Sequence, residues 1–458
     1  MSELPNRVCI IGAGSSGMAA CKVFKDHGIP FDCYEAGDRV GGNWVYNNSN
    51  KMSSAYQSLF INTSKPRMQY SDYPMPDDYP VFPHHTQIAE YFNAYVEHFG
   101  VKQYIHFRTL VTQARSLEGG GWEVTLHDGT MHRYRALLVA NGHHWDPRWP
   151  EPPFPGRFDG SVIHSHYYKV PDEYVGKRVL VLGFGNSAMD IAVETSRVSA
   201  MTYIAVRRGF HVIPKYIMGR PLDQLQVPLP IPFSLQLRIY HLMVGMQRGK
   251  MSNYGFPEPD HRIGQAHPTV SSDILMRIVH GRIKVKPNMR QLDGDGVIFV
   301  DGSREQIDSI IYCTGYKITF PFFQPEVYEA KNNDLPLYYH VFPPQYRDLF
   351  FIGFVQPLGA IMPLAELQSV WISRYLIGQY SLPATQEMWR EIDRTRQQMR
   401  KRYGNAPRHT IQVDVEPYVG SIRKEMERGK DRPSTPLITP DRTFFAGGSA
   451  SVETGSYS

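Results

Sequence analysis

A strand, a glycine turn and a helix follow one another near the start of the chain, and this pattern constrains the fold more than any other feature. The apolar run Val8 to Ile11 precedes the turn "GAGSSG" (12–17), and a helix is expected to reach about His27. A second strand, Phe31 to Tyr34, follows and ends at Glu35. Glycines let the backbone turn tightly and let a pyrophosphate approach the helix N-terminus. This is the pattern of a βαβ dinucleotide-binding unit.

The same pattern occurs a second time. Val179 to Leu182 precede the turn "GFGNSA" (183–188), a helix is expected to about Val198, and Thr202 to Val206 form the next strand. A single glycine turn is weak support for a nucleotide site, but here the flanking strand and helix are present in both copies. The sequence therefore predicts an α/β protein with two Rossmann-like dinucleotide-binding domains.

The second unit is expected to be inserted into the first. Residues 120–147 and 297–316 each form a β segment with a turn and then an apolar strand that ends near a glycine. The chain would leave the first domain near Pro147 and return near Thr314. The domains assigned on this basis are 1–165 and 313–458 for the first, and 166–312 for the second, with an irregular or helical insertion at about 220–265.

The residue that ends each second strand indicates which nucleotide binds. Glu35 ends the first unit, and its carboxylate suits an unphosphorylated ribose diol, as in FAD or NAD. Arg207 and Arg208 end the second unit and would pair with a 2′-phosphate, which favours NADPH. FAD beside NADPH indicates a flavin reductase of some kind. No CxxC motif is present to accept the electrons, so oxygen is the remaining common acceptor.

Charge and cysteine usage narrow the class of protein. The net charge is +5, from 49 basic and 44 acidic residues, which is too weak and too evenly spread for nucleic-acid binding. Two histidine pairs, His84-His85 and His143-His144, have no cysteine or carboxylate at metal-ligand spacing and are interpreted as loop histidines. The four cysteines are expected to be buried, reduced thiols of a cytoplasmic protein: Cys9, Cys21, Cys33 and Cys313.

No run of 18 apolar residues occurs, so no integral membrane anchor is expected. The N-terminus enters a strand by Arg7, which argues against a signal peptide. The nearest candidate for a membrane segment, 229–246, is interrupted by Gln236, Arg238 and His241. We interpret it as a buried helix that caps the active site.

The stretch before the second glycine turn reads Phe158-x-Gly160-x-x-x-His164-x-x-x-Tyr168. It resembles the FxGxxxHxxx(Y/F) fingerprint of flavin-containing monooxygenases. The resemblance extends over most of the chain through the motifs "GAGSSG" (12–17), "GGNW" (41–44), "INTSK" (61–65), "YSDYPMPDDYP" (70–80), "GFGNSAMDIAVE" (183–194), "CTGY" (313–316), "FPFF" (320–323) and "PLGAIMPLAELQSVW" (357–371).

The resemblance implies an NADPH- and O2-dependent FAD monooxygenase that oxygenates soft nitrogen or sulfur atoms, in tertiary amines and sulfides, through a C4a-hydroperoxyflavin. Baeyer–Villiger relatives usually close the fingerprint with Trp-Pro, whereas this chain has Tyr168-Lys169, which favours heteroatom oxygenation. The alternatives are a Baeyer–Villiger oxygenase of ketones, an NADPH oxidase that releases hydrogen peroxide, and a redox sensor that binds FAD without turnover. A homodimer is common in the family.

The resemblance also implies roles for particular residues. Asn62 corresponds to an asparagine near the flavin C4a and is the expected catalytic residue, and the fingerprint residues are expected to couple cofactor binding to domain geometry. The residues expected to bind the cofactors are Gly12, Gly14, Ser15, Gly17, Glu35, Arg39, Gly42, Trp44, Asn62, Gln368, Gly183, Gly185, Asn186, Ser187, Arg207, Arg208, Thr314 and Gly315.

Overall fold

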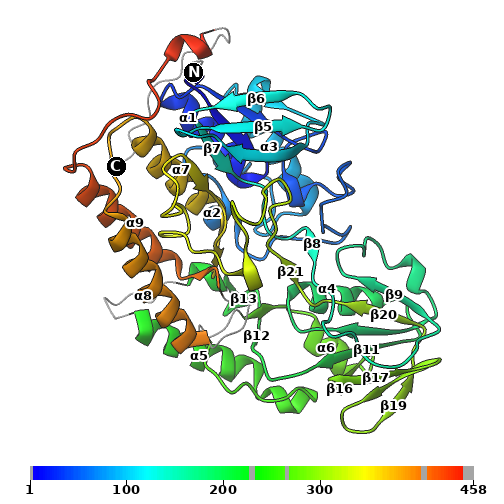
Figure 1. Ribbon diagram of the computed structural model, residues 1–458. Coiled ribbons are helices and arrows are strands. Elements are labelled where there is room, and N and C mark those ends of the chain that lie inside the picture. Colours follow the sequence, from blue (N-terminus) through cyan, green and yellow to red (C-terminus); the bar gives the residue numbers. More distant parts are fainter. Residues whose placement is uncertain (1–3, 226–232, 264–267, 404–409, 447–458) are drawn as a thin grey trace. The chain divides into compact units, whose positions relative to one another are not determined.

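Two compact units make up the protein in its computed structural model, which describes residues 4–225, 233–263, 268–403 and 410–446 (Figure 1). The first unit is formed by Met1–Ser53, Lys65–Asp146 and Lys317–Ser458. The second is formed by Ser54–Ser64 and Pro147–Tyr316. The short strands β8 (Asp146–Pro147) and β21 (Tyr316–Lys317) span the two later points at which the chain passes between units.

A five-stranded parallel sheet forms the centre of the first unit, in the order β22-β7-β1-β2-β3. In β1 all four residues are buried, and Val8 lies opposite Phe31 of β2 and Ala136 of β7. Such continuous apolar runs are typical of parallel strands that are covered on both faces. The strands are β1 (Val8–Ile11), β2 (Phe31–Tyr34), β3 (Ile105–His106), β7 (Ala136–Val139) and β22 (Leu349–Phe351).

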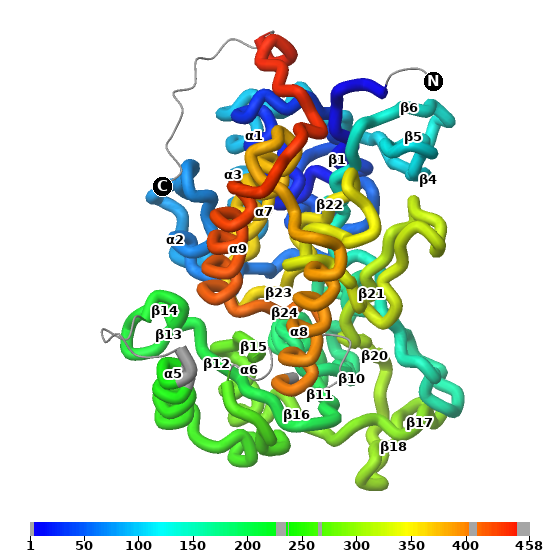
Figure 2. Tube along the Cα trace, turned by 60° about the vertical axis from the view of Figure 1, so that its left-hand side comes forward, coloured from blue at the N-terminus to red at the C-terminus, as the bar shows by residue number. Residues whose placement is uncertain are grey.

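Helices and a small antiparallel sheet surround this centre. α1 packs against α7, and α7 against α9, as Figures 1 and 2 show. The helices are α1 (Ser15–Asp26), α2 (Lys65–Met68), α3 (His85–His98), α7 (Met362–Leu376), α8 (Thr385–Tyr403) and α9 (Val415–Gly429), with short 3-10 turns at Gly42–Trp44, Lys102–Tyr104, Lys331–Asn333 and Arg442–Phe445. The further strands are β4 (Val111–Ser116), β5 (Trp122–Leu126) and β6 (Met131–Tyr134), and the pair β23 (Gln356–Pro357) and β24 (Gln412–Val413).

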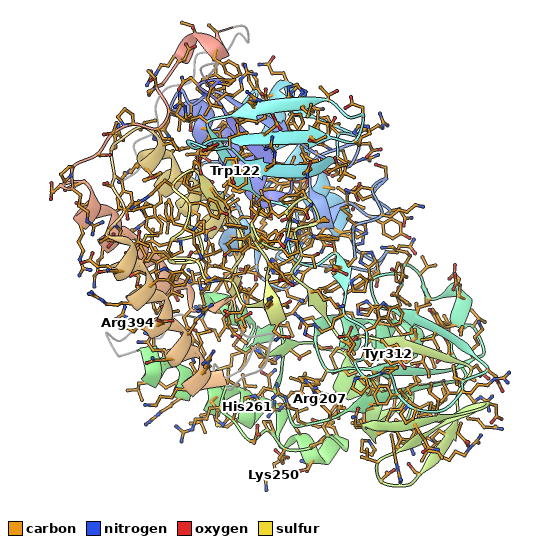
Figure 3. The ribbon with its side chains drawn as sticks, viewed as in Figure 1. Trp122, Arg207, Lys250, His261, Tyr312 and Arg394 are labelled. Atoms are coloured by element: carbon orange, nitrogen blue, oxygen red, sulfur yellow. The ribbon has the colours of Figure 1, made fainter. Side chains whose placement is uncertain are left out.

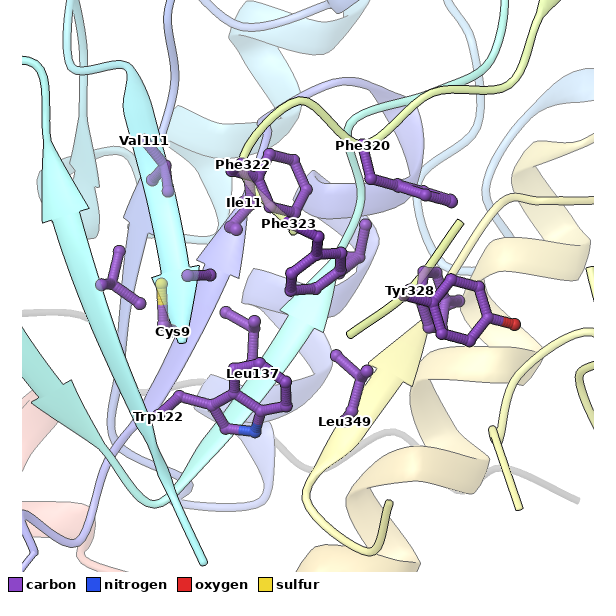
Figure 4. Close-up of a cluster of buried hydrophobic side chains, with 14 of the residues drawn as sticks. Cys9, Ile11, Val111, Trp122, Leu137, Phe320, Phe322, Phe323, Tyr328 and Leu349 are labelled. Carbon is purple, nitrogen blue, oxygen red and sulfur yellow. The ribbon is translucent and has the colours of Figure 1, made fainter. Parts of the chain in front are cut away.

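The core of the first unit is strongly aromatic (Figure 4). Trp122 of β5 packs against Phe323, with ring centroids 5.7 Å apart, and Phe320 packs against Phe351 at 5.2 Å. Leu137 of β7 belongs to the same cluster. Buried aromatic pairs add roughly 0.5–1.5 kcal/mol each beyond their area burial. The "FPFF" segment (320–323) therefore anchors the returning chain to the sheet.

A buried carboxylate on α7 gives the first unit a specific pH dependence. Glu366 accepts hydrogen bonds from the Ser71 amide at 2.9 Å and the Ser71 hydroxyl at 3.1 Å. Burial raises the pKa of Glu366 to about 7. Because this pKa is higher in the folded than in the unfolded state, the stabilising contribution of the protonated group is lost as the pH rises through about 7.

Glu366→Gln is expected to remove this loss, because the amide still accepts from Ser71 and carries no charge. Between about pH 5 and about pH 7 the variant should lose less stability than the unsubstituted protein, by about 1–3 kcal/mol, because the folded and unfolded states bind different numbers of protons in that window. Thermal unfolding across that range measures it. The exposed Glu416→Gln on α9 is the control, and equal pH slopes for all three proteins would contradict the prediction.

The second unit repeats the plan of the first. Its parallel sheet has the order β16-β11-β10-β20-β9, and an antiparallel sheet β17-β18-β19 accompanies it. The strands are β9 (Ser161–His164), β10 (Arg178–Leu182), β11 (Met201–Val206), β16 (Ile283–Pro287), β17 (Met289–Asp293), β18 (Gly296–Phe299), β19 (Arg304–Gln306) and β20 (Ser309–Tyr312). The helices are α4 (Asn186–Thr195), α5 (Phe233–Arg248) and α6 (Ile274–Val279), with 3-10 turns at Asp172–Tyr174, Leu222–Gln224 and Met251–Tyr254. Two small pairs, β12 (Val212–Ile213) with β15 (Thr269–Val270) and β13 (Tyr216–Ile217) with β14 (Arg220–Pro221), complete the unit.

The predicted fold is confirmed, while the limits of the units differ from the expected domain ranges. β9 is the edge strand of the second sheet, so the chain has already entered the second unit by Ser161, before the expected limit at residue 165. Residues 54–64 also belong to the second unit although they precede both crossings expected from the sequence. Cys313 directly follows β20 and is half-buried, whereas the sequence predicted a buried thiol.

The interpretation of 229–246 as a buried helix is wrong for the part that the structure describes. α5 exposes Leu235, Leu242 and Met246, and Val244 is the one buried residue among its described side chains. Val244 joins a small cluster with Ile213 and Ile217, which covers one face of the helix only. No helix within the described residues is both long and apolar enough to cross a bilayer.

Candidate functional site

The first glycine turn is shaped by close backbone approaches. Gly12 has φ +100°, and a Cβ there would lie 2.7 Å from the Ala140 carbonyl oxygen. A Cβ on Gly17 would lie 1.9 Å from the Gly12 oxygen. Gly14 is the N-cap of α1 and provides no side-chain cap, so the first amides of α1, beginning at Ser15, are left open to an anion.

A second glycine loop packs directly on this turn. The Gly41 amide donates to the Ala13 carbonyl at 3.0 Å. Gly42, with φ +54°, brings its backbone against Gly14, whose Cα would be 3.2 Å from a Cβ on Gly42. A half-buried Trp44 ends the 3-10 turn. The two loops form one cradle lined by backbone atoms. Side chains at these glycine positions would fill it.

Glu35 lies at the end of β2 beside this cradle. Its carboxylate accepts from the Ala13 amide at 2.8 Å and the Gly37 amide at 2.7 Å. Burial raises the pKa of Glu35, and these two backbone hydrogen bonds oppose the rise. Asn50 also donates to Oε1 at 3.4 Å, whereas Oε2 accepts from the Ala13 amide and has a further lone pair that can accept a ribose hydroxyl.

Two of the predicted cofactor residues have other partners in the first unit. Arg39 is exposed and pairs with its neighbour Asp38 at 3.0 Å. Gln368 is fully buried on α7; its Oε1 accepts from the Gly353 amide at 2.9 Å and its Nε2 donates to the Tyr418 hydroxyl at 2.7 Å. Gly353 lies against Ser16, so Gln368 supports the glycine turn from behind.

The second glycine turn has a more open form. Gly183 has φ +144°, and a Cβ there would meet the Cys313 oxygen at 2.5 Å. A Cβ on Gly185 would meet nothing within 4 Å, which leaves room for a ligand. Gly185 caps α4 without a side-chain bond, so the amides near Asn186 and Ser187 are open as well. The Asn186 Oδ1 accepts from the Val270 amide at 2.9 Å and so ties the turn to β15.

The arginine pair directly follows β11. Arg207 is exposed (Figure 3). The Arg208 guanidinium lies 5.6 Å from the centroid of the Phe184 ring within the turn. Its Nε is buried and has no hydrogen-bond partner within the described part of the chain. An unpartnered donor beside an open glycine turn fits an incoming phosphate.

Thr314 and Gly315 follow β20, the strand that pairs with β10, which leads into Gly183. The Thr314 hydroxyl donates to the Arg148 carbonyl at 2.5 Å, and the Arg148 amide donates to the Gly315 carbonyl at 2.9 Å. Gly315 has φ +85°. These bonds fix the strand end that borders the second cradle.

The fingerprint residues lie in and around β9. Phe158 packs against the cluster that includes Leu180, and a Cβ on Gly160 would be 2.4 Å from the Asp308 oxygen. His164 is fully buried, and its Nδ1 accepts from the His166 amide at 3.1 Å. Burial and the neighbouring His166 lower the pKa of His164 to about 4, so it is neutral at physiological pH.

The last fingerprint residue meets the segment that carries Asn62. The Tyr168 hydroxyl donates to Glu194 of α4 at 2.9 Å, and the Tyr168 ring lies 6.2 Å from that of Tyr56. Asn62 itself is half-buried, and its amide has no hydrogen-bond partner among the residues that the structure describes. Asn62 and Tyr168 thus belong to the same unit, and the segment 54–64 contacts Tyr168 through Tyr56.

The chemistry of the two cradles fits two dinucleotides. The first cradle combines the open amides of α1 with the Glu35 carboxylate at the end of β2, as the pyrophosphate and ribose of FAD require. The second combines the open amides of α4 with Arg208 and Arg207, as the phosphates of NADPH require. Over the described ranges, no three His, Cys, Asp or Glu side chains are grouped so that they could hold a metal ion.

Comparisons with known proteins agree with this geometry. Residues 5–443 match the family model described as flavin-binding monooxygenase-like. The chain belongs to this family. Flavin-containing monooxygenase 5 of Rattus norvegicus is 39% identical over 430 residues, which cover 89% of this chain and 80% of the relative. Dimethylaniline monooxygenase [N-oxide-forming] 2 of Macaca mulatta is 34% identical over 447 residues, which cover 92% and 83%.

Solved structures support the same family fold. The S-allyl-L-cysteine S-oxygenase from Allium sativum aligns with a TM-score of 0.69 at 25% identity, over 92% of this chain and 88% of that one. A steroid monooxygenase bound to NADP aligns with a TM-score of 0.70 at 16% identity, over 94% and 99%, and is similar in fold alone. This family member is therefore a flavin monooxygenase, an NADPH-dependent enzyme with FAD as its cofactor.

Proposed function

We propose that this flavin monooxygenase uses NADPH and O2 to oxygenate soft nucleophilic nitrogen or sulfur atoms, in tertiary amines and sulfides. The observation that carries the proposal is the difference between the two cradles: one ends in the buried Glu35, the other in Arg207 and Arg208. The N-oxide-forming relative and the S-oxygenase, similar over most of this chain, support the substrate class.

The chain's own residues bind and orient in this scheme. FAD, when bound, supplies the redox and oxygen chemistry. The first cradle would hold FAD through the amides after Gly14 and through Glu35. Asn62, whose amide has no hydrogen-bond partner within the described part of the chain, would act as a hydrogen-bond donor at the oxygen site. Four free cysteines fit a reducing, cytoplasmic location.

Product analysis under labelled oxygen tests the proposal. Purified protein with NADPH would be supplied in turn with methyl phenyl sulfide, a tertiary amine and a cyclic ketone, while peroxide and NADPH consumption are followed. One labelled oxygen atom in the sulfoxide and in the N-oxide is expected. Ester from the ketone alone would indicate a Baeyer–Villiger enzyme, and peroxide in place of product would indicate an oxidase. A yellow protein that does not consume NADPH would point to a sensor.

Asn62→Asp is expected to separate NADPH oxidation from oxygenation. A carboxylate cannot donate the hydrogen bond that the amide donates, and one such donor at an oxyanion site contributes roughly 100- to 1000-fold to rate. Product formation should fall by about that factor while NADPH oxidation continues and the released peroxide accounts for it. The neighbouring Thr63→Val is the control, and unchanged product yield in Asn62→Asp would refute the role.

A further inference from the structure

The segment 54–64, which carries Asn62, is held by the second unit at several points. The Gln57 amide donates to the Lys169 carbonyl at 2.9 Å, and the Lys169 ammonium donates to the Ala55 carbonyl at 3.0 Å. Lys169 directly follows the fingerprint. The beginning of the segment is therefore tied to the strand-to-turn region that precedes the second glycine turn.

Asp190 of α4 ties the same segment to the helix that follows the second glycine turn. The Tyr56 hydroxyl donates to the Asp190 carboxylate at 2.5 Å. Glu194, one turn further along α4, accepts from Tyr168, whose ring packs on Tyr56. Two neighbouring turns of α4 thus bind the segment 54–64 through Tyr56 and the fingerprint through Tyr168.

The hairpin β13–β14 holds the segment on both sides of Asn62. The Lys215 ammonium donates at 2.9 Å to the carbonyl of Ile61, the peptide group that leads into Asn62. Two residues beyond Asn62, the Ser64 amide donates to the Asp223 carboxylate at 2.7 Å and the Ser64 hydroxyl accepts from Gln224 at 2.9 Å.

The base of the hairpin joins these contacts into one structure. The Leu222 amide donates to the Lys215 carbonyl at 2.9 Å, so the residues on the two sides of the hairpin are held together. Lys215 is half-buried; burial lowers the pKa of its ammonium, and the charges of Asp190 and Asp273 oppose this and favour the ammonium form. A half-buried ammonium with a fixed carbonyl acceptor has few alternative positions.

We propose that Lys215, Asp223 and Gln224 form a hairpin clamp that positions Asn62, and that Lys215 is a positioning residue for oxygenation. This rests on the proposed function in one respect: the catalytic consequence requires that Asn62 act at the oxygen site. The clamp itself does not depend on the proposed function, because it concerns only how the segment 54–64 is held in place. Part of the 220–265 insertion thereby has a role in the reaction.

The test compares Lys215→Met, Lys215→Arg and the matched control Lys286→Met in the FAD-loaded protein. Lys286 is also a half-buried lysine of the second unit, but it pairs with Glu305 of β19. Two quantities are measured: hydrogen exchange of the peptide that covers 54–64, without NADPH, and the share of NADPH electrons that appear as peroxide with a sulfide substrate.

Lys215→Met is expected to raise exchange in 54–64 by about tenfold, the loss that one charged hydrogen bond implies. The peroxide share should rise with an unchanged KM for NADPH, and Lys215→Arg should restore both quantities, because the guanidinium can also donate. A merely structural role would not raise the peroxide share while leaving the KM for NADPH unchanged. Lys286→Met should change neither quantity.

The failures of the two proposals are distinguishable. If Lys215→Met changes neither exchange nor the peroxide share while Asn62→Asp abolishes product, the clamp is overturned and the role of Asn62 stands. If exchange rises in Lys215→Met but neither variant alters product, the clamp holds the segment and the oxygenation role fails. If Lys286→Met matches Lys215→Met, the effect is general and the clamp is overturned.

Discussion

Gly17→Ala is expected to yield a protein that no longer retains FAD. The new Cβ would lie 1.9 Å from the Gly12 carbonyl oxygen, a backbone atom that no rotamer change can move. α1 would have to shift away from the turn, and with it the amides that face the pyrophosphate. We expect FAD binding to weaken at least tenfold and stability to fall by about 1–3 kcal/mol, as for other overpacked sites.

The second unit supplies the matched control. Ala188 occupies the corresponding place in its glycine turn and is fully buried, so that turn accommodates a methyl group. Ala188→Gly should cost about 1 kcal/mol or less, from helix propensity, and should leave FAD content unchanged. Flavin absorbance per mole of purified protein, with thermal unfolding of both variants, measures the contrast. Full FAD content in Gly17→Ala would show that the first turn does not hold the pyrophosphate.

The turns and central strands were predictable because their pattern is local. The expected strands Val8 to Ile11 and Phe31 to Tyr34 coincide with β1 and β2. In β1, burial on both faces leaves a continuous apolar run that ends at a turn. The second unit was also found, although α4 ends at Thr195 instead of near Val198.

The attachment of the Asn62 segment was not predictable, because its partners are distant in sequence. Tyr56 and Asp190 are 134 positions apart, and Lys215 is 154 positions from Ile61. No local pattern marks Lys215 or Asp223, whereas Lys169 could have been suspected from its place beside the fingerprint. The family motif likewise indicated Gln368 as a cofactor residue. It did not predict that the oxygen and the nitrogen of its side-chain amide both form hydrogen bonds within the chain.

Replacing both Arg207 and Arg208 by glutamine is expected to remove the preference for NADPH over NADH. Two charged donors at the end of β11 would lose their pairing with the 2′-phosphate, and charged hydrogen bonds contribute roughly 1.5–3 kcal/mol each. KM for NADPH should rise by roughly 100-fold or more, while KM for NADH, which lacks the phosphate, should stay within about threefold.

The single variants separate the two arginines. Arg208 is the better placed before binding, because its guanidinium lies over Phe184 and its buried Nε is without a partner in the described chain. Arg208→Gln should therefore have the larger effect, and the exposed Arg197→Gln, from the end of α4, should have none. Steady-state kinetics with both nucleotides, and competition by 2′-AMP against 5′-AMP, measure this. Equal losses for NADPH and NADH would mean that the arginines serve the shared part of the nucleotide or the fold, and the assignment of the second cradle to the 2′-phosphate would be wrong.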